Sequence, residues 1–301
     1  MTGKVNFFIV GAPKCGTTTL HHFLIGHPSV DFGARKEPHL FATDLQMKGT
    51  ITDSEYRSGY DFENSETRVF GDASVMHLYS ERAAENIFDY NPFAKILIML
   101  RPPVDFLVSY HHEQYYNQVE DRPSLREGWT LVGQRRAGSK IPSSCPDWRF
   151  LDYGEIARFD VQLLRYISRF PSENVRVGFL DDMKQRPEEF IAALYSFLDL
   201  STDGRQELGH FASAKTYRRG WQKWLVRQAS NSTVQTLWRS FKSNLGITRR
   251  FKFVHRFRVA NTISGEKERI EKDFAREIEE HYSKSWESAQ QLSASFRLLA
   301  N

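Results

Sequence analysis

Short runs of apolar residues, each followed by an amphipathic stretch, recur along the first two thirds of the chain. Residues 5–10 (VNFFIV) are apolar and β-prone, and a glycine-bearing loop after them leads into a helix predicted over 17–25. A second run, 95–100 (KILIML), precedes a proline-containing helix start, and a third strand candidate is 174–183 (NVRVGFLDDM). Repeated strand-then-helix units predict an α/β fold whose central, mainly parallel sheet is flanked by helices.

The pattern changes in two places. Residues 118–150 contain turn residues and no sustained period, which predicts a long surface insertion, and insertions of this kind often serve as lids or substrate loops. From residue 266 an amphipathic, mixed-charge pattern predicts a helix, and we expect the part 225–301 to be mainly helical. Because no internal repeat divides the chain, we expect a single domain over 1–301.

Composition narrows the class of protein. Among the 301 residues, 40% are hydrophobic and 26% are charged, as in ordinary globular proteins rather than disordered ones. The net charge of +4 only mildly favours anionic partners. No apolar run reaches membrane-spanning length, and Cys15 and Cys145 give no disulfide framework. We expect a cytoplasmic protein without stable membrane insertion; an anchor absent from this sequence stays an open alternative.

Candidate chemistry begins in the loop "GAPKCGTTTL". Gly11 and Gly16 keep the spacing of the phosphate-binding motif G-x-x-x-x-G-K-[ST], but Thr17 stands at the lysine position and Lys14 lies inside the loop. A strand, such a loop and a helix start direct backbone N–H groups toward one point, where a phosphate binds. Hydroxyl donors are added by Thr17, Thr18 and Thr19. An ordinary strand-to-helix turn is the alternative, although a lysine between the glycines has little purpose there.

Two other enzyme classes fit this loop less well. A Mg²⁺-dependent ATPase has an acidic residue after its second strand, whereas 95–100 is followed by Arg101. A cysteine phosphatase built on Cys15 needs an arginine about six positions later, where His21 stands instead. Two cationic loops after neighbouring strands suit a nucleotide with two separated anionic groups and no metal.

The runs "PKCGTTTL" and "RPPVDFLVSY" resemble the two signatures of sulfotransferases that use 3′-phosphoadenosine 5′-phosphosulfate, PAPS. This resemblance implies a three-layer, P-loop-like fold and a Lys14 ammonium that reaches the bridging oxygen where leaving-group charge develops. It further implies that Arg101 and Ser109 bind the 3′-phosphate. The 5′-phosphosulfate would be cradled by Pro13, Lys14, Cys15, Gly16, Thr17, Thr18 and Thr19. Pro102 departs from the acidic or amide residue usual at its position.

The segment "ARKEPHLFATD" resembles the E-x-H-F-F segment of heparan-type glycosaminoglycan sulfotransferases, with Leu40 in place of an aromatic residue. The resemblance implies that Glu37 is the general base for the acceptor hydroxyl and that His39 assists it. The alternative is a surface turn in which Glu37 forms a salt bridge with Arg35 or Lys36.

Two further segments match more loosely. "GDASVMHLY" resembles the family's E-K-T-P-x-Y segment, which would bring Asp72, Ser74 and His77 to the acceptor cleft, unless His77 is structural. "SAKTYRRGW" lies where the family has a basic loop over the nucleotide, and it is otherwise a solvated basic loop. The contacts expected from that loop to the 3′-phosphate are Arg218, Arg219 and Gly220.

Taken together, the resemblance implies a PAPS-dependent sulfotransferase that needs no metal and transfers a sulfuryl group to a hydroxyl, or less readily an amine, of a carbohydrate. Small-molecule, lipid and polyketide acceptors stay open. A protein of another class, a non-catalytic nucleotide- or polyanion-binding module, would not need Glu37. We expect no nucleic-acid partner, and the oligomeric state is left open.

Overall fold

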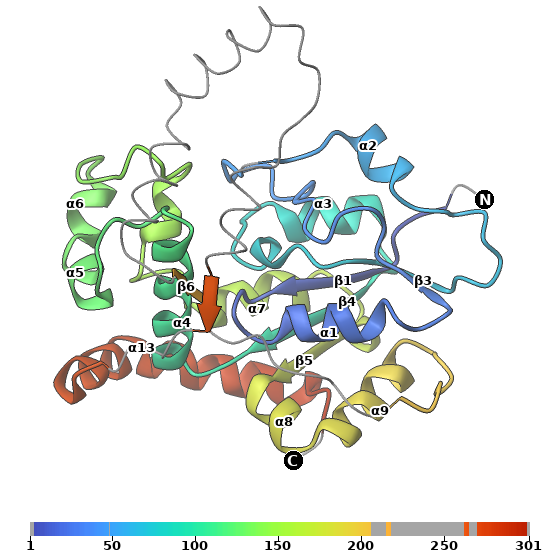
Figure 1. Cartoon of the computed structure of the whole chain (residues 1–301). Coiled ribbons are helices and arrows are strands. Elements are labelled where there is room, and N and C mark those ends of the chain that lie inside the picture. Colours follow the sequence, from blue (N-terminus) through green and yellow to red (C-terminus); the bar gives the residue numbers. More distant parts are fainter. Residues whose placement is uncertain (1–2, 48, 206–214, 218–261, 265–269, 300–301) are drawn as a thin grey trace, which may run out of the picture.

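A five-stranded parallel sheet forms the centre of the computed structural model, which describes residues 3–47, 49–205, 215–217, 262–264 and 270–299 (Figure 1). The strands lie in the order β2-β3-β1-β4-β5, and every pairing is parallel. Their bounds are β1 Phe7–Gly11, β2 Val30–Asp31, β3 Val69–Asp72, β4 Lys95–Leu100 and β5 Val175–Phe179. The predicted α/β fold with a central parallel sheet is confirmed.

Helices cover both faces of this sheet. Figure 1 shows α1 in front of the sheet and α7 behind it, and α13 packs along α7. The α-helices are α1 Thr17–Leu24, α2 Asp53–Ser58, α3 Ala83–Tyr90, α4 Pro103–Tyr116, α5 Leu125–Thr130, α6 Val132–Arg136, α7 Phe159–Ile167, α8 Leu180–Gln185, α9 Pro187–Phe197 and α13 Lys272–Ser293. Short 3₁₀ turns are η1 Val75–His77, η2 Trp148–Leu151, η3 Ser172–Asn174 and η4 Ala294–Phe296. Among the helices of the described residues, none has the length and apolarity to cross a membrane.

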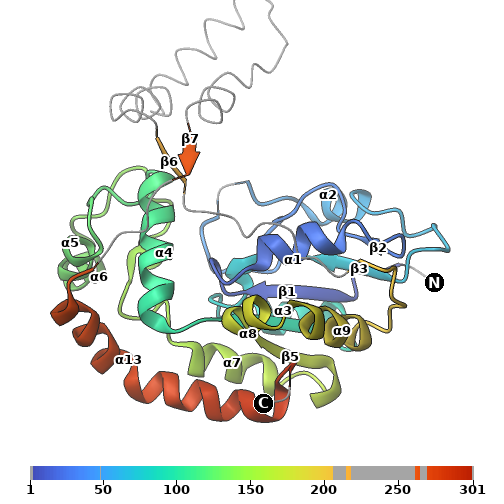
Figure 2. The same cartoon turned by 60° about the horizontal axis from the view of Figure 1, so that its bottom comes forward.

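A second, two-stranded sheet is antiparallel and separate from the first. It pairs β6, Lys215–Tyr217, with β7, Thr262–Ser264. Strand β6 lies against α4 (Figure 2).

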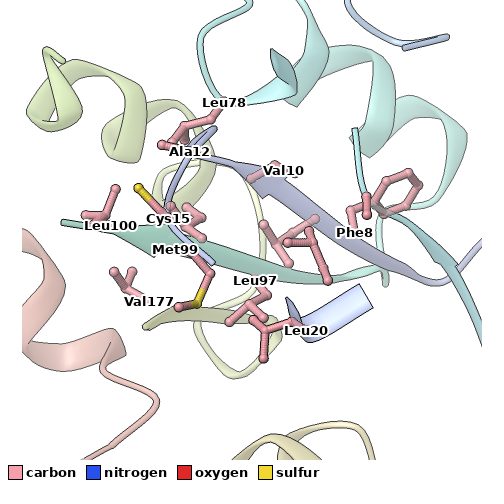
Figure 3. Packing of buried hydrophobic residues seen from close by; sticks show 14 of the residues in the cluster. Phe8, Val10, Ala12, Cys15, Leu20, Leu78, Leu97, Met99, Leu100 and Val177 are labelled. Carbon is pink, nitrogen blue, oxygen red and sulfur yellow. The ribbon is translucent and has the colours of Figure 1, made fainter. Parts of the chain in front are cut away.

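Apart from Lys95 at the start of β4, the neighbouring strands β1 and β4 consist of apolar residues. All five residues of β1 and the last five of β4 are buried, as expected for a parallel sheet between helical layers. Figure 3 shows Val10 of β1, Leu97 of β4 and Leu20 of α1 in one continuous core. The two loops that follow these strands are therefore attached to the most rigid part of the fold.

The order of the strands predicts a ligand crevice at the carboxyl ends of β1 and β4. From β1 the chain moves to β2 and β3 on one side of the sheet and then crosses to β4 on the other side. Ligands of open α/β sheets bind outside the carboxyl ends of the strands at such a switch point. The loop after Gly11 and the residue after Leu100 both lie there.

The insertion 118–150 contains more regular structure than its sequence pattern predicts, because α5 and α6 lie within it. A buried ion pair holds it together: the Arg135 guanidinium donates to both Glu120 carboxylate oxygens at 2.7 and 2.8 Å. The Tyr153 hydroxyl donates to Glu120 at 2.8 Å. On the outside, Arg126 of α5 pairs with Asp273 of α13. That this insertion acts as a lid stays a prediction.

Breaking the buried pair should destabilise the protein strongly. Arg135→Met leaves the fully buried Glu120 carboxylate without its cation, so we expect the free energy of unfolding to fall by about 3–5 kcal/mol. Urea denaturation followed by fluorescence measures this loss. The control is Arg82→Met, which removes a solvent-exposed pair with Glu85 and should cost no more than about 1 kcal/mol. A loss below 1 kcal/mol for Arg135→Met would contradict the role assigned to the pair.

Candidate functional site

The loop after β1 depends on its two glycines. Gly11 has φ 149° and Gly16 has φ 86°, which L-amino acids with a side chain rarely adopt. A Cβ atom at position 11 would lie 2.5 Å from the Val75 carbonyl oxygen. At position 16 it would lie 2.3 Å from the Met183 side chain. Both glycines are therefore required for the loop to turn tightly against η1 and α8.

The end of this loop is the N-terminus of α1, which has the features of an anion site. Gly16 is the N-cap residue, and no described side chain caps the helix there, so the first backbone N–H groups and the positive end of the helix dipole are available to a ligand. Thr17 and Thr19 are buried and Thr18 is half-buried. The arrangement fits a phosphate-sized anion.

Lys14 has an unusual backbone conformation within the loop. Its φ is 63°, which is uncommon for a residue with a side chain. The backbone is held by Arg101, whose Nη1 donates to the Lys14 carbonyl oxygen at 3.3 Å. Its ammonium lies 3.4 Å from the carboxylate of Glu113 on α4.

Arg101 directly follows β4 and carries its charge into the same crevice. Its side chain is only 8% exposed, and its second amino group lies 3.4 Å from the Asp105 carboxylate. Its Nε atom is buried without a partner among the described residues. A buried cation with an unsatisfied donor beside the loop fits an anionic group of a ligand.

Helix α4 carries two further residues of interest at helical spacing. Ser109 lies two turns beyond Arg101, and Glu113 follows Ser109 by four residues, so they share one face of the helix. Sequence reasoning missed Glu113, although this spacing from Ser109 was a signal that could have found it.

Cys15 lies in the core rather than in an accessible site. Its side chain is fully buried beside Met99 and Leu100 (Figure 3). Burial raises the pKa of the Cys15 thiol to about 12, against the opposing effect of Arg101 and Lys14. A thiolate nucleophile is therefore disfavoured, which agrees with the interpretation of Cys15 as a small loop residue.

The structure brings Glu37 and His39 together and joins them to the loop. The His39 Nε2 atom lies 3.6 Å from Glu37 Oε2. Lys36 donates to Glu37 Oε1 at 2.7 Å and to the Thr18 hydroxyl at 2.8 Å. Glu37 therefore does form the salt bridge with Lys36 that the alternative predicted. The same Lys36 ammonium also contacts Thr18, in the first turn of α1. Sequence reasoning treated Lys36 only as a partner for Glu37.

A buried hydrogen-bond chain holds the backbone of this segment. The His39 backbone N–H donates to the Ser74 hydroxyl at 3.0 Å, and the Ser74 backbone N–H donates to Asp72 at 2.8 Å. The Tyr56 hydroxyl donates to the other Asp72 oxygen at 2.9 Å. Burial raises the pKa of Asp72 to about 6, against the effect of these hydrogen bonds.

The expectation that Asp72, Ser74 and His77 line the acceptor cleft is wrong, because all three are buried. Asp72 and Ser74 instead support the segment that carries Glu37, because their hydrogen-bond chain ends at the His39 backbone N–H. Neither ring nitrogen of His77 has a partner within the described part of the chain, so it is not a satisfied structural histidine either. Burial lowers the pKa of His77 well below 6.5 and also lowers that of His39.

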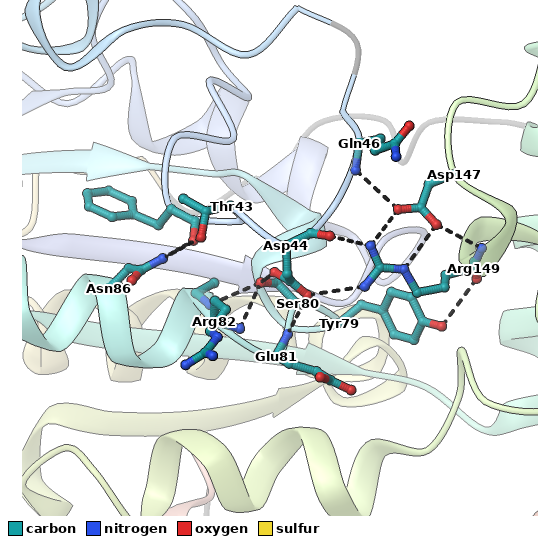
Figure 4. Close-up of polar contacts among 12 residues, drawn as sticks. Thr43, Asp44, Gln46, Tyr79, Ser80, Glu81, Arg82, Asn86, Asp147 and Arg149 are labelled. Atoms are coloured by element: carbon teal, nitrogen blue, oxygen red, sulfur yellow. Dashed lines mark hydrogen bonds and ion pairs between the residues drawn. The ribbon is translucent and has the colours of Figure 1, made fainter.

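The residues after His39 are fixed from two sides (Figure 4). Asn86 of α3 donates to the Phe41 carbonyl at 2.8 Å. Asp44 accepts from Ser80 and lies 3.4 Å from Arg149. Arg149 also binds Asp147 at 2.6 Å. The insertion and α3 together therefore hold the segment that follows Glu37 and His39.

Three of the predicted site residues, Arg218, Arg219 and Gly220, lie outside the described residues. They come directly after β6, which lies against α4. The predicted contacts of these residues with a 3′-phosphate stay predictions.

Comparison with known proteins agrees with this geometry. The family model described as "Sulfotransferase domain" matches residues 4–290. The chain belongs to the sulfotransferase family. A solved structure of a sulfotransferase from Alicyclobacillus acidocaldarius is 27% identical and superimposes with a TM-score of 0.60 over 75% of this chain and 91% of that one.

Curated relatives are longer than this chain. Carbohydrate sulfotransferase 15 of Homo sapiens is 23% identical over 249 residues, covering 65% of this chain and 44% of the relative. The membrane-associated sulfotransferase kil1 of Dictyostelium discoideum is 28% identical over 267 residues, covering 65% of this chain and 56% of the relative. The chain thus spans about half the length of these two relatives.

The buried histidines predict how stability depends on pH. Because the folded state disfavours protonated His77, the unfolded state binds more protons below its usual pKa of 6.5. The contribution of His77 to the free energy of unfolding should therefore be largest above pH 6.5 and should fall as the pH drops below it, whereas Asp72, whose pKa burial raises to about 6, acts in the opposite direction. The free energy of unfolding of His77→Leu should fall less steeply than that of the wild type as the pH drops. Part of the decline should remain, because the pKa of His39 is also lowered.

Denaturant unfolding between pH 5 and 8 checks this prediction. The control is His22→Leu, at an exposed position, which should keep the wild-type slope. A His77→Leu slope equal to that of the wild type would contradict it.

Proposed function

We propose that the protein is a PAPS-dependent sulfotransferase that transfers a sulfuryl group to a hydroxyl of a carbohydrate. The observation that carries this proposal is the connection of Glu37 to Thr18 through Lys36. It joins a carboxylate suited to general-base chemistry to a helix N-terminus suited to a phosphate. Family membership supports PAPS as the donor.

In this proposal each end of the donor has its own cation. The first turn of α1, with its threonines, binds the 5′-phosphate, and Arg101 with Ser109 binds the 3′-phosphate, which ATP lacks. The buried, unsatisfied Nε of Arg101 supports that assignment. Lys14 leaves Glu113 and donates to the bridging oxygen. Charge develops on that oxygen as the S–O bond breaks.

The acceptor side completes the reaction. Glu37 takes the acceptor's hydroxyl proton while the acceptor oxygen forms a bond to sulfur; the bridging S–O bond breaks, and its electron pair leaves with adenosine 3′,5′-bisphosphate. The His39 Nε2 atom lies 3.6 Å from the second oxygen of the Glu37 carboxylate, and a small movement would let it hydrogen-bond to that oxygen. A carbohydrate acceptor is supported by the similarity to carbohydrate sulfotransferase 15.

Replacing Glu37 by its amide should separate catalysis from donor binding. Glu37→Gln keeps the size of the side chain but cannot accept the proton, so we expect turnover to fall by about 10²–10⁴-fold. Affinity for adenosine 3′,5′-bisphosphate should change little. Transfer of labelled sulfate from PAPS to desulfated glycosaminoglycans and neutral oligosaccharides measures turnover, and calorimetry measures the affinity.

The matched control is Glu63→Gln, at an exposed position, which should retain wild-type turnover. Wild-type turnover by Glu37→Gln would contradict the assigned base. Label that transfers to lipid or aromatic acceptors, and to none of the carbohydrates, would contradict the acceptor class.

A further inference from the structure

Lys36 lies between Thr18 and Glu37 but has no role in the proposed reaction so far. Its ammonium donates to Thr18 Oγ1 at 2.8 Å and to Glu37 Oε1 at 2.7 Å. Its side chain is 28% exposed, which is low for a lysine. Two short contacts with partners from separate segments outweigh the rotamer entropy that a lysine loses on being held. A lysine fixed in this way has a specific task.

The two contacts place the ammonium between the donor and acceptor sides of the proposed site. Because both oxygens bond to one nitrogen, Thr18 Oγ1 and Glu37 Oε1 cannot lie farther apart than the two hydrogen bonds laid end to end. If Thr18 binds the 5′-phosphate and Glu37 takes the acceptor proton, the sulfur atom must pass between them. Lys36 is then beside the path of the transferred group.

The positive charge of Lys36 affects the two nearby histidines, His21 and His39. Burial lowers the pKa of His21, and Lys36 adds to this effect; burial also lowers the pKa of His39, where Glu37 opposes it and Arg35 and Lys36 add smaller contributions. His21 lies on α1 and His39 lies beyond Glu37, so the ammonium acts on both sides of the site. An ammonium has three N–H donors, and Thr18 and Glu37 accept two of them.

We propose that Lys36 is a further catalytic residue, whose third N–H donates to a non-bridging oxygen of the transferring sulfuryl group. This inference rests on the proposed function. Lys14 and Lys36 then have different tasks, since Lys14 stabilises charge on the departing bridging oxygen. Lys36 holds the sulfuryl group in line between the departing oxygen and the acceptor hydroxyl at Glu37, and it moves no proton and breaks no bond itself.

The test compares two ligands that differ only in the sulfuryl group. PAPS carries it, and adenosine 3′,5′-bisphosphate does not, so the ratio of their affinities isolates its contacts without knowledge of the acceptor. Lys36→Met removes the charge and keeps the length of the side chain. Because a charge-assisted hydrogen bond is lost, we expect PAPS to bind at least tenfold more weakly. The bisphosphate should change by less than threefold.

Two more variants make the comparison specific. Lys4→Met is the matched control, because Lys4 donates instead to the Tyr90 carbonyl in an exposed contact, and it should leave both affinities unchanged. Lys36→Arg keeps the charge and should restore part of the PAPS preference. Calorimetry with each ligand, and a thermal unfolding curve for each variant, provide the data.

The outcomes separate this inference from the proposed function. Selective loss of PAPS affinity in Lys36→Met supports it. Equal weakening of both ligands would overturn it and indicate a structural role in holding the loop, and unchanged affinities would overturn it as well. Failure of the wild type to bind either ligand would instead overturn the proposed function, and this inference with it.

Discussion

The pairing of β1 with β4 at the centre of the sheet is the constraint on which the candidate site depends. Phe7, Phe8 and Ile9 pair in register with Lys95, Ile96 and Leu97, and the Ala12 backbone N–H donates to the Met99 carbonyl at 2.7 Å. This register brings the end of one strand, with Lys14 after it, beside the end of the other, with Arg101 after it. Lys14 and Arg101 thus lie near each other at one edge of the sheet, and the chain segments that carry them there are short.

Carboxylates pair with these cations in the structure. Lys14 faces Glu113, Arg101 faces Asp105, and Lys36 contacts Glu37. Each of these acids is partly exposed, with Asp105 at 62% and Glu113 at 38%, so solvent weakens the attraction. Under the proposed function, a multiply charged nucleotide replaces Asp105 as the partner of Arg101 and Glu113 as the partner of Lys14. Lys36 differs because its second contact, with Thr18, belongs to the loop itself.

Much of the fold followed from the sequence because the apolar runs are continuous. The strand predicted over 95–100 is β4, and the helix predicted over 17–25 is α1 with its end one residue earlier. The third run was predicted too long: the strand ends at Phe179, and the remaining residues, with acidic Asp181 and Asp182 in the first turn, form α8. The short strand β2 gave no periodic signal.

The site was predictable only where a motif carried it. Lys14, Arg101 and Glu37 are recognisable from local sequence, whereas the contacts of Glu113 with Lys14, of Tyr56 with Asp72 and of His39 with Ser74 join residues that are far apart in the sequence. The burial of His77 could not be predicted from local sequence either, because it comes from the packing of Phe41 and His39 around it. The single-domain assignment and the cytoplasmic location stay predictions.

Titration of the protein with adenosine 3′,5′-bisphosphate and with ATP, each with and without Mg²⁺, tests the central claim most directly. The account predicts that the bisphosphate binds without a metal and more tightly than ATP. It also predicts that Arg101→Gln weakens bisphosphate binding by about tenfold or more through loss of a charge-assisted contact, while Arg169→Gln, at an exposed position, does not. Binding of ATP with Mg²⁺ alone, or an unchanged affinity in folded Arg101→Gln, would contradict it.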